Sequence, residues 1–140
     1  MGSTSDTLET RIRDKIRKSR RTVFLRDDFT SLAGYDQVGR ALRQLEAQGR
    51  LVRVGQGLYA KARKNRITGQ PMLAAPGGFE QVAKEALNRL GVKWEPASAE
   101  KAYQAGGTQV PARVVVKVKG PFHRRIAFGR YQLGVERVTA

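Results

Sequence analysis

Cysteine is absent from this 140-residue chain, and histidine occurs once, at His123. The absence of cysteine excludes disulfides and thiolate metal sites, and a lone histidine beside Arg124 has no neighbouring side chain with which to bind a metal ion. Walker loops, nucleophile elbows and HExxH helices are also missing. Asp27 and Asp28 suggest a two-metal nuclease, but carboxylates in the first turn of a helix account for them more simply. The sequence therefore predicts no enzymatic activity, no cofactor and no metal site.

Long apolar runs are missing as well. No segment approaches the roughly 20 consecutive apolar residues of a membrane-spanning helix, and the first five residues lack the apolar stretch of a secretory signal. There is also no long basic amphipathic helix and no lipidation motif. We therefore expect a cytoplasmic protein without a membrane partner.

Acidic residues are few. The chain has 12 aspartates and glutamates against 27 lysines and arginines, which gives a formal net charge of +15. The excess is spread along the sequence: residues 1–66 hold 16 basic and 7 acidic groups, and residues 67–140 hold 11 and 5. Such an excess raises self-repulsion in the folded state and points to a polyanionic partner. The alternative is a basic surface that is simply solvated.

The stretch from Asp36 to Gly49 predicts an amphipathic helix. Apolar side chains recur at i, i+3, i+4 and i+7 from Val38 to Leu45, which places them on one stripe. Asp36 is positioned to cap the N-terminus, and Gly49 stands where the end of a helix favours a positive φ. At 100° per residue, the arginines of this stretch point away from the apolar stripe and its glutamines lie on the flank.

A hairpin follows this helix. Its two short strands, 51–54 and 58–60, are joined by a Gly-Gln-Gly turn at 55–57. A helix with a basic, polar outer face followed by a hairpin is the layout of a winged helix-turn-helix. Such a helix fits the major groove of DNA, and the hairpin, or wing, reaches the neighbouring backbone. We therefore expect double-stranded DNA as the partner.

Ten residues of this unit are candidates for DNA contact. We expect the candidates on the helix to contact base edges or phosphates, and the candidates around the wing to contact phosphates. The alternative for each charged or amide side chain is a solvated surface position, and for the tyrosine it is packing at the entry to the helix. The candidates are Tyr35, Gln37, Arg40, Arg43, Gln44, Arg53, Gln56, Lys61, Arg63 and Lys64.

The predicted fold class is α+β, with two domains. Residues 5–66 form the winged helix-turn-helix, and residues 67–78, broken by glycine and proline, form a linker. Residues 79–140 form a small α+β domain with an antiparallel hairpin. This second domain is expected to serve in packing, in dimerisation or in binding a partner.

Several patterns define the elements of the second domain. Residues 79–90 predict an amphipathic helix, and 114–118 predict a strand with alternating valines. A Gly-Arg pair at 129–130 fits the connection of a type II′ hairpin, and 98–103 is expected to be a short helix. The single apolar face these elements provide is small. The domain should therefore pack onto the first, form a homodimer, or both.

Six segments between Ser5 and Val138 follow the pattern of one known family. They are 26–29 (RDDF), 38–45 (VGRALRQL), 49–60 (GRLVRVGQGLYA), 107–113 (GTQVPAR), 124–126 (RRI) and 128–130 (FGR). The first three resemble the N-terminal winged helix of AbiEi-type antitoxins, and the last three resemble the second domain of that family.

The resemblance implies a bacterial or mobile-element regulator. AbiEi-type proteins repress their own operon through the winged helix and neutralise a nucleotidyltransferase-like toxin. We therefore expect a sequence-specific transcriptional repressor, acting on its own or a mobile-element operon. Two alternatives stay open: an antitoxin that also binds a cognate toxin through its C-terminal domain, and a nonspecific nucleic-acid-binding accessory protein.

Overall fold

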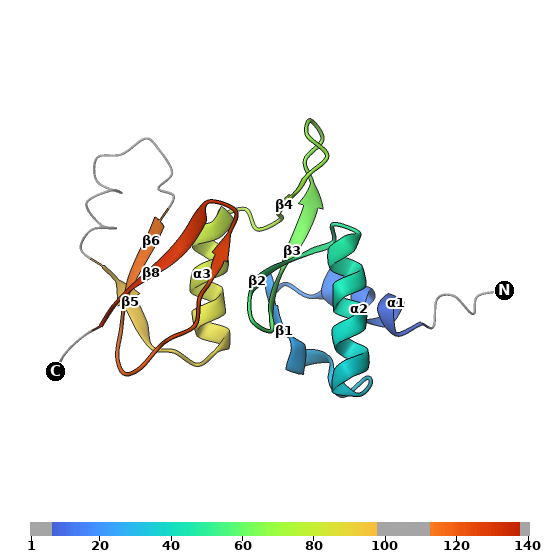
Figure 1. The fold of residues 1–140 in the computed structure, drawn as a ribbon, viewed down its shortest axis with the longest axis horizontal. Coiled ribbons are helices and arrows are strands. Elements are labelled where there is room, and N and C mark those ends of the chain that lie inside the picture. The colour runs from blue at the N-terminus through green and yellow to red at the C-terminus, as the bar shows by residue number, and fades with distance from the viewer. Residues whose placement is uncertain (1–6, 98–112, 138–140) are drawn as a thin grey trace.

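The computed structural model describes residues 7–97 and 113–137, which form a mixed α+β fold with three α-helices and two sheets (Figure 1). The α+β class predicted from the sequence is confirmed, whereas the helix predicted at 98–103 lies outside the described residues. In chain order the elements are α1 (Leu8–Lys18), β1 (Val23–Leu25), the 3-10 helix η2 (Arg26–Phe29), α2 (Tyr35–Ala47), β2 (Leu51–Gly55), β3 (Leu58–Lys64), β4 (Pro71–Leu73), α3 (Gly78–Arg89), β5 (Trp94–Pro96), β6 (Arg113–Val118), β7 (Ala127–Phe128) and β8 (Tyr131–Arg137).

Helix α2 carries five of the ten candidate residues, and it begins earlier than its pattern predicts. Gly34 is the N-cap, and its backbone N–H donates to Gln37 Oε1 at 3.3 Å. The prediction of Asp36 as the cap is wrong, because Tyr35 already has helical geometry and Asp36 lies within the first turn. The C-terminal end agrees with the prediction, since Gly49 takes a φ of 77°.

The first sheet is antiparallel, with the central order β1-β3-β2. Strands β2 and β3 form the predicted hairpin, with a shift in register between Arg53 and Gly55. Gly57 has a φ of 68° in the turn, a conformation that glycine adopts without steric cost. The closed end of the hairpin is therefore a tight, glycine-rich turn.

Strand β4 lies within the stretch that the sequence predicts to be a linker. It pairs antiparallel with the distal end of β3. The chain reverses between them through a turn in which Asn65 Oδ1 accepts hydrogen bonds from the backbone N–H groups of Ile67 and Thr68. Glycine and proline concealed this hairpin, because here they mark a turn and the first residue of a strand, where proline is tolerated.

Alternating side chains bury both faces of the first sheet. Phe24, Leu51 and Tyr59 pack with buried residues of α1 and α2, among them Ile12 and Leu42. Their neighbours along the strands point to the opposite face, where they meet α3: Val23, Val52, Val54, Leu58 and Ala60 share a core with Val82, Ala83 and Ala86.

The second sheet is mixed, with the order β5-β6-β8-β7. Strands β7 and β8 form the predicted antiparallel hairpin, and Gly129 in its connection has a φ of 58°. Strand β6 runs parallel to β8, which the sequence did not predict. A parallel pair needs a crossover connection. The segment between β6 and β7, which is part of this connection, passes the β2–β3 hairpin, where Arg124 donates to the Gln56 carbonyl.

Helix α3 lies between the two sheets (Figure 1). One side contributes to the core with the first sheet, and Leu87 on another side packs against Val116 and Val118 of the second sheet. The second half of the chain, from α3 onward, therefore packs onto the first half, from α1 to β4. Such packing was expected because the second half has only a small apolar face.

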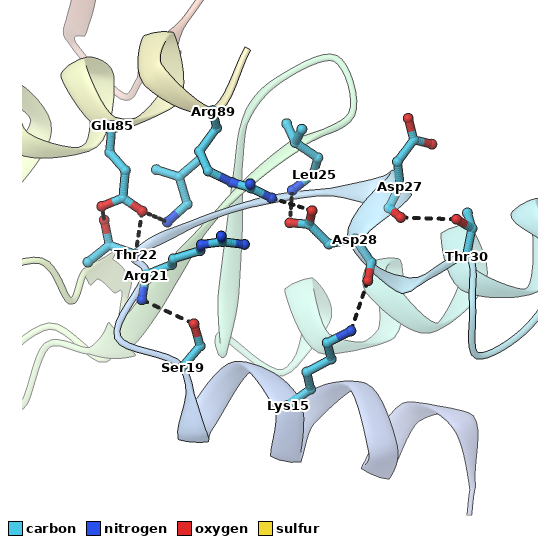
Figure 2. A network of polar contacts seen from close by, with 11 residues as sticks. Lys15, Ser19, Arg21, Thr22, Leu25, Asp27, Asp28, Thr30, Glu85 and Arg89 are labelled. Carbon is cyan, nitrogen blue, oxygen red and sulfur yellow. Dashed lines mark hydrogen bonds and ion pairs between the residues drawn. The ribbon is translucent and has the colours of Figure 1, made fainter. Parts of the chain in front are cut away.

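Polar contacts reinforce this junction, as Figure 2 shows. The Glu85 carboxylate of α3 accepts hydrogen bonds from the backbone N–H of Thr22 at 2.7 Å, from the Thr22 hydroxyl at 2.7 Å and from the backbone N–H of Val23 at 2.8 Å. At the end of the same helix, Arg89 forms an ion pair with Asp28, and both side chains are 19% exposed. We call Glu85, Arg89 and these partners the α3 clasp.

Candidate nucleic-acid interface

The outer face of α2 is polar and basic. Its inner face buries Val38, Leu42 and Leu45 in the core. Arg40 and Arg43 are exposed on the opposite side. The assignment of the two faces from periodicity is therefore confirmed, and this helix presents two arginines to solvent.

Seven of the ten candidate residues divide over two grooves that flank α2. The first, which we call the α1 groove, is a shallow, open depression of about 440 Å³ between α2 and the N-terminal part of α1. It is lined by Gln37, Arg40 and Gln44 on the α2 side and by Arg11 on the α1 side. Three of the predicted contact residues thus share one side of the helix.

The second groove, which we call the hairpin groove, lies between α2 and the β2–β3 hairpin. Its volume is about 600 Å³. Four candidates line it: Tyr35 and Arg43 from α2, and Arg53 and Gln56 from the hairpin. The fold thus brings together residues that the sequence placed in two separate elements.

The other three candidates lie along β3, outside both grooves. Lys61 is partly buried, and its Nζ donates to the backbone carbonyl of Ser19, just beyond the end of α1, at 2.6 Å. This bond gives Lys61 a structural contact. Arg63 and Lys64 are exposed where β3 pairs with β4. They are available to solvent but are not gathered with the seven residues around α2.

Arg26 belongs to the hairpin groove, although sequence reasoning missed it. Its guanidinium carbon lies 3.5 Å from the centroid of the Tyr35 ring, and its Nη2 donates to the Tyr35 carbonyl at 2.7 Å. It also forms an ion pair with Asp36 at 3.8 Å. A Cβ at position 39 would lie 2.3 Å from Arg26 Nη2, so Gly39 leaves room for this arrangement. A glycine in mid-helix was the available signal, because it can mark a close approach.

Two further arginines enter the hairpin groove from the second half of the chain. Arg89 reaches it from the end of α3, and Arg124 from the segment before β7. Arg124 Nη1 donates to the backbone carbonyl of Gln56, at the tip of the hairpin, over 3.0 Å. No local sequence pattern indicates this contact, because the two residues are 68 positions apart.

The five arginines of the hairpin groove differ in their charge partners. Arg26 and Arg89 pair with Asp36 and Asp28, respectively. Arg43, Arg53 and Arg124 form no ion pair with any residue in the described ranges. Asp27 and Glu46 also line the groove without pairing with these three. The groove therefore has cationic groups that lack a partner charge within the described protein.

A family model described as a family of unknown function, DUF6088, matches residues 11–139. This chain belongs to that family. No curated protein and no solved structure matches it. The matched range begins within α1 and ends beyond β8, so it includes α2 and all residues of the hairpin groove, but not the residues of the α1 groove that precede Arg11.

Asp28 has structural partners that bear on the two-metal alternative. Its Oδ2 accepts from the Leu25 backbone N–H at 2.9 Å, and its Oδ1 pairs with Arg89. In the described ranges, no three histidines or carboxylates come together in a way that could hold a metal ion. Nor is any helix there long and apolar enough to cross a bilayer. The features that stand out in these ranges are the basic grooves.

Proposed function

We propose that this protein binds double-stranded DNA and acts as a transcriptional repressor by occupying operator DNA. The observation that carries the proposal is the outer face of α2, which bears Arg40 and Arg43 and is flanked by grooves on both sides. The major groove of DNA is wide enough to admit such a helix, and arginine recognises guanine through two hydrogen bonds.

The order of the elements supports a winged helix-turn-helix. Helix α1, the short η2 and then α2 precede the β2–β3 hairpin, and strand β1 joins the hairpin in one sheet. In this interpretation α2 is the recognition helix and the hairpin is the wing. Arg53 and Gln56 on the wing then contact the sugar-phosphate backbone, which fixes the position of the helix on the duplex.

The glutamines of α2 differ in their freedom to read bases. Gln37 Oε1 already accepts the Gly34 backbone N–H, so its amide must release this bond to pair bidentately with adenine. Gln44 is exposed and has no such bond within the described residues. We therefore favour Gln44 over Gln37 as a base-reading residue, together with Arg40 and Arg43.

The role as a repressor rests on the resemblance to AbiEi-type antitoxins. Such proteins act on their own operon, so the region upstream of this gene is the first DNA to test. The formal charge of +15 supports a nucleic-acid partner but does not distinguish specific from nonspecific binding. Footprinting makes that distinction directly.

The experiment combines footprinting on the upstream region with a salt titration of the affinity. We expect a protected site, and binding to it that exceeds binding to unrelated DNA of equal length. If about six phosphates are neutralised, log affinity falls against log salt with a slope near −5, at roughly −0.9 per phosphate. Uniform protection without a preferred site would support a nonspecific accessory protein. A slope shallower than about −2 would exclude the basic surface as the main source of affinity.

A further inference from the structure

The segment between β6 and β7 packs directly against the β2–β3 hairpin. A Cβ placed on Gly55 would lie 2.9 Å from the backbone carbonyl oxygen of Arg125, so only glycine permits this approach without a shift. One residue earlier, Arg124 Nη1 donates to the Gln56 carbonyl at 3.0 Å. The tip of the hairpin is therefore held by a segment of the second half of the chain.

Arg124 has donor capacity beyond this bond. A guanidinium carries five N–H donors in a planar fork, and one of them serves Gln56. Arg124 is exposed, and it forms no ion pair and no second hydrogen bond with the residues at 7–97 and 113–137. Its charge is thus positioned by the fold but not matched by a carboxylate there.

The position of Arg124 continues the surface that binds DNA in the proposed function. It lines the hairpin groove with Arg43 of α2 and Arg53 of the hairpin. These three arginines, all without an ion pair in the described ranges, come from three separate parts of the chain and meet around one groove. A phosphate beside the tip of the hairpin would lie close to a guanidinium that is already fixed there. Arginine binds phosphate oxygens in a planar, bidentate manner.

We propose that Arg124 binds a phosphate of the DNA backbone beside the hairpin, so that the second half of the chain forms part of the DNA interface. This inference rests on the proposed function, and it gives the second half a role other than packing, dimerisation or toxin binding. Because a phosphate carries no sequence information, the contact adds affinity without adding base preference.

The test compares Arg124→Gln with Lys119→Gln in the full chain. Both substitutions remove one positive charge from the second half, but Lys119 is an exposed residue just beyond β6 that does not line the groove. Arg124→Gln should make the salt slope shallower by about 0.9, which corresponds to roughly eightfold weaker binding at 0.1 M salt. The loss should be equal on the preferred site and on unrelated DNA. Lys119→Gln should leave the slope unchanged.

A third variant, Arg124→Lys, separates the phosphate contact from support of the hairpin. Lysine keeps the charge and should retain most of the salt slope. If Arg124→Lys is as weak as Arg124→Gln, the residue acts by holding Gln56, and the proposed phosphate contact is wrong. Equal slopes for Arg124→Gln and Lys119→Gln would also overturn it, while leaving DNA binding by α2 intact. If the wild-type protein binds no DNA, it is the proposed function that fails.

Discussion

The α3 clasp and the hairpin groove are neighbouring regions that use charge in opposite ways. In the clasp, Glu85 accepts three hydrogen bonds from the start of β1, and Arg89 is paired with Asp28 (Figure 2). In the groove, Arg43 and Arg53 have no ionic partner among the described residues. Arg89 belongs to both regions, but the charged side chains of the clasp are all paired or hydrogen-bonded, whereas the groove also holds arginines without a carboxylate partner in the described ranges.

This difference separates a structural role from a binding role. A charge that is largely buried depends on its partner, because removing one member of the pair leaves the other charge without compensation. An exposed charge without a partner contributes little to stability but remains available to an external anion. Substitutions of the paired residues of the clasp should therefore change stability, and substitutions of the groove arginines that lack a partner should change DNA affinity.

The largest expected effect is that of Arg89→Ala. Loss of the guanidinium leaves Asp28 partly buried without its cationic partner, and we expect a decrease of about 3 kcal/mol in the free energy of unfolding. Urea denaturation measures it. Arg66→Ala removes an exposed charge from the turn between β3 and β4 and should change stability by less than about 0.5 kcal/mol. Similar losses in the free energy of unfolding for the two variants would show that the Arg89–Asp28 ion pair contributes no more than an exposed charge does.

A somewhat smaller loss is expected for Glu85→Ala. This variant leaves the backbone N–H groups of Thr22 and Val23 without their acceptor, which should cost about 2 kcal/mol. Hydrogen exchange at these two amides should also become faster, because their bonds to the carboxylate are gone. Glu95→Ala, at an exposed position in β5, is the matched control and should change neither quantity. Unchanged exchange at Thr22 and Val23 would contradict the role given to Glu85.

The smallest effect on stability is expected for Arg43→Gln, in the groove. Its free energy of unfolding should stay within about 0.5 kcal/mol of the wild type. Affinity for the preferred DNA site should fall by about 1–3 kcal/mol if Arg43 reads a base. Arg17→Gln removes an arginine that is exposed but paired with Asp14 at 3.6 Å, and it should bind DNA almost as well as the wild type. A large loss of stability in Arg43→Gln would remove the distinction between groove and clasp.

Local periodicity was sufficient to predict the elements around α2. The i, i+3, i+4, i+7 spacing from Val38 to Leu45 identified the buried face, and the glycine-rich turn at 55–57 identified the hairpin. Both signals reflect backbone geometry over a few residues. The cap was misplaced for the same reason, because a favourable residue type at Asp36 cannot reveal that Gly34 already has its N–H bonded to Gln37.

Contacts between distant segments could not be predicted in this way. Alternating valines identified β6 as a strand but gave no indication that β8 would be its parallel neighbour. The hairpin groove was only half foreseen, since Arg26, Arg89 and Arg124 enter it through tertiary packing. Such a site depends on how elements meet, and a single sequence carries little direct information about that.

The hydrogen bonds made by the backbone along β1 have a further consequence for self-association. The backbone N–H groups of Thr22, Val23 and Leu25 all donate to side-chain carboxylates, those of Glu85 and Asp28. An edge strand whose donors are already occupied is a poor template for another β-strand, and natural proteins use such protection against edge-to-edge aggregation. The same carboxylates that join the two halves thus make β1 unsuitable for extending the sheet into a second copy. A homodimer of this protein should form through another surface.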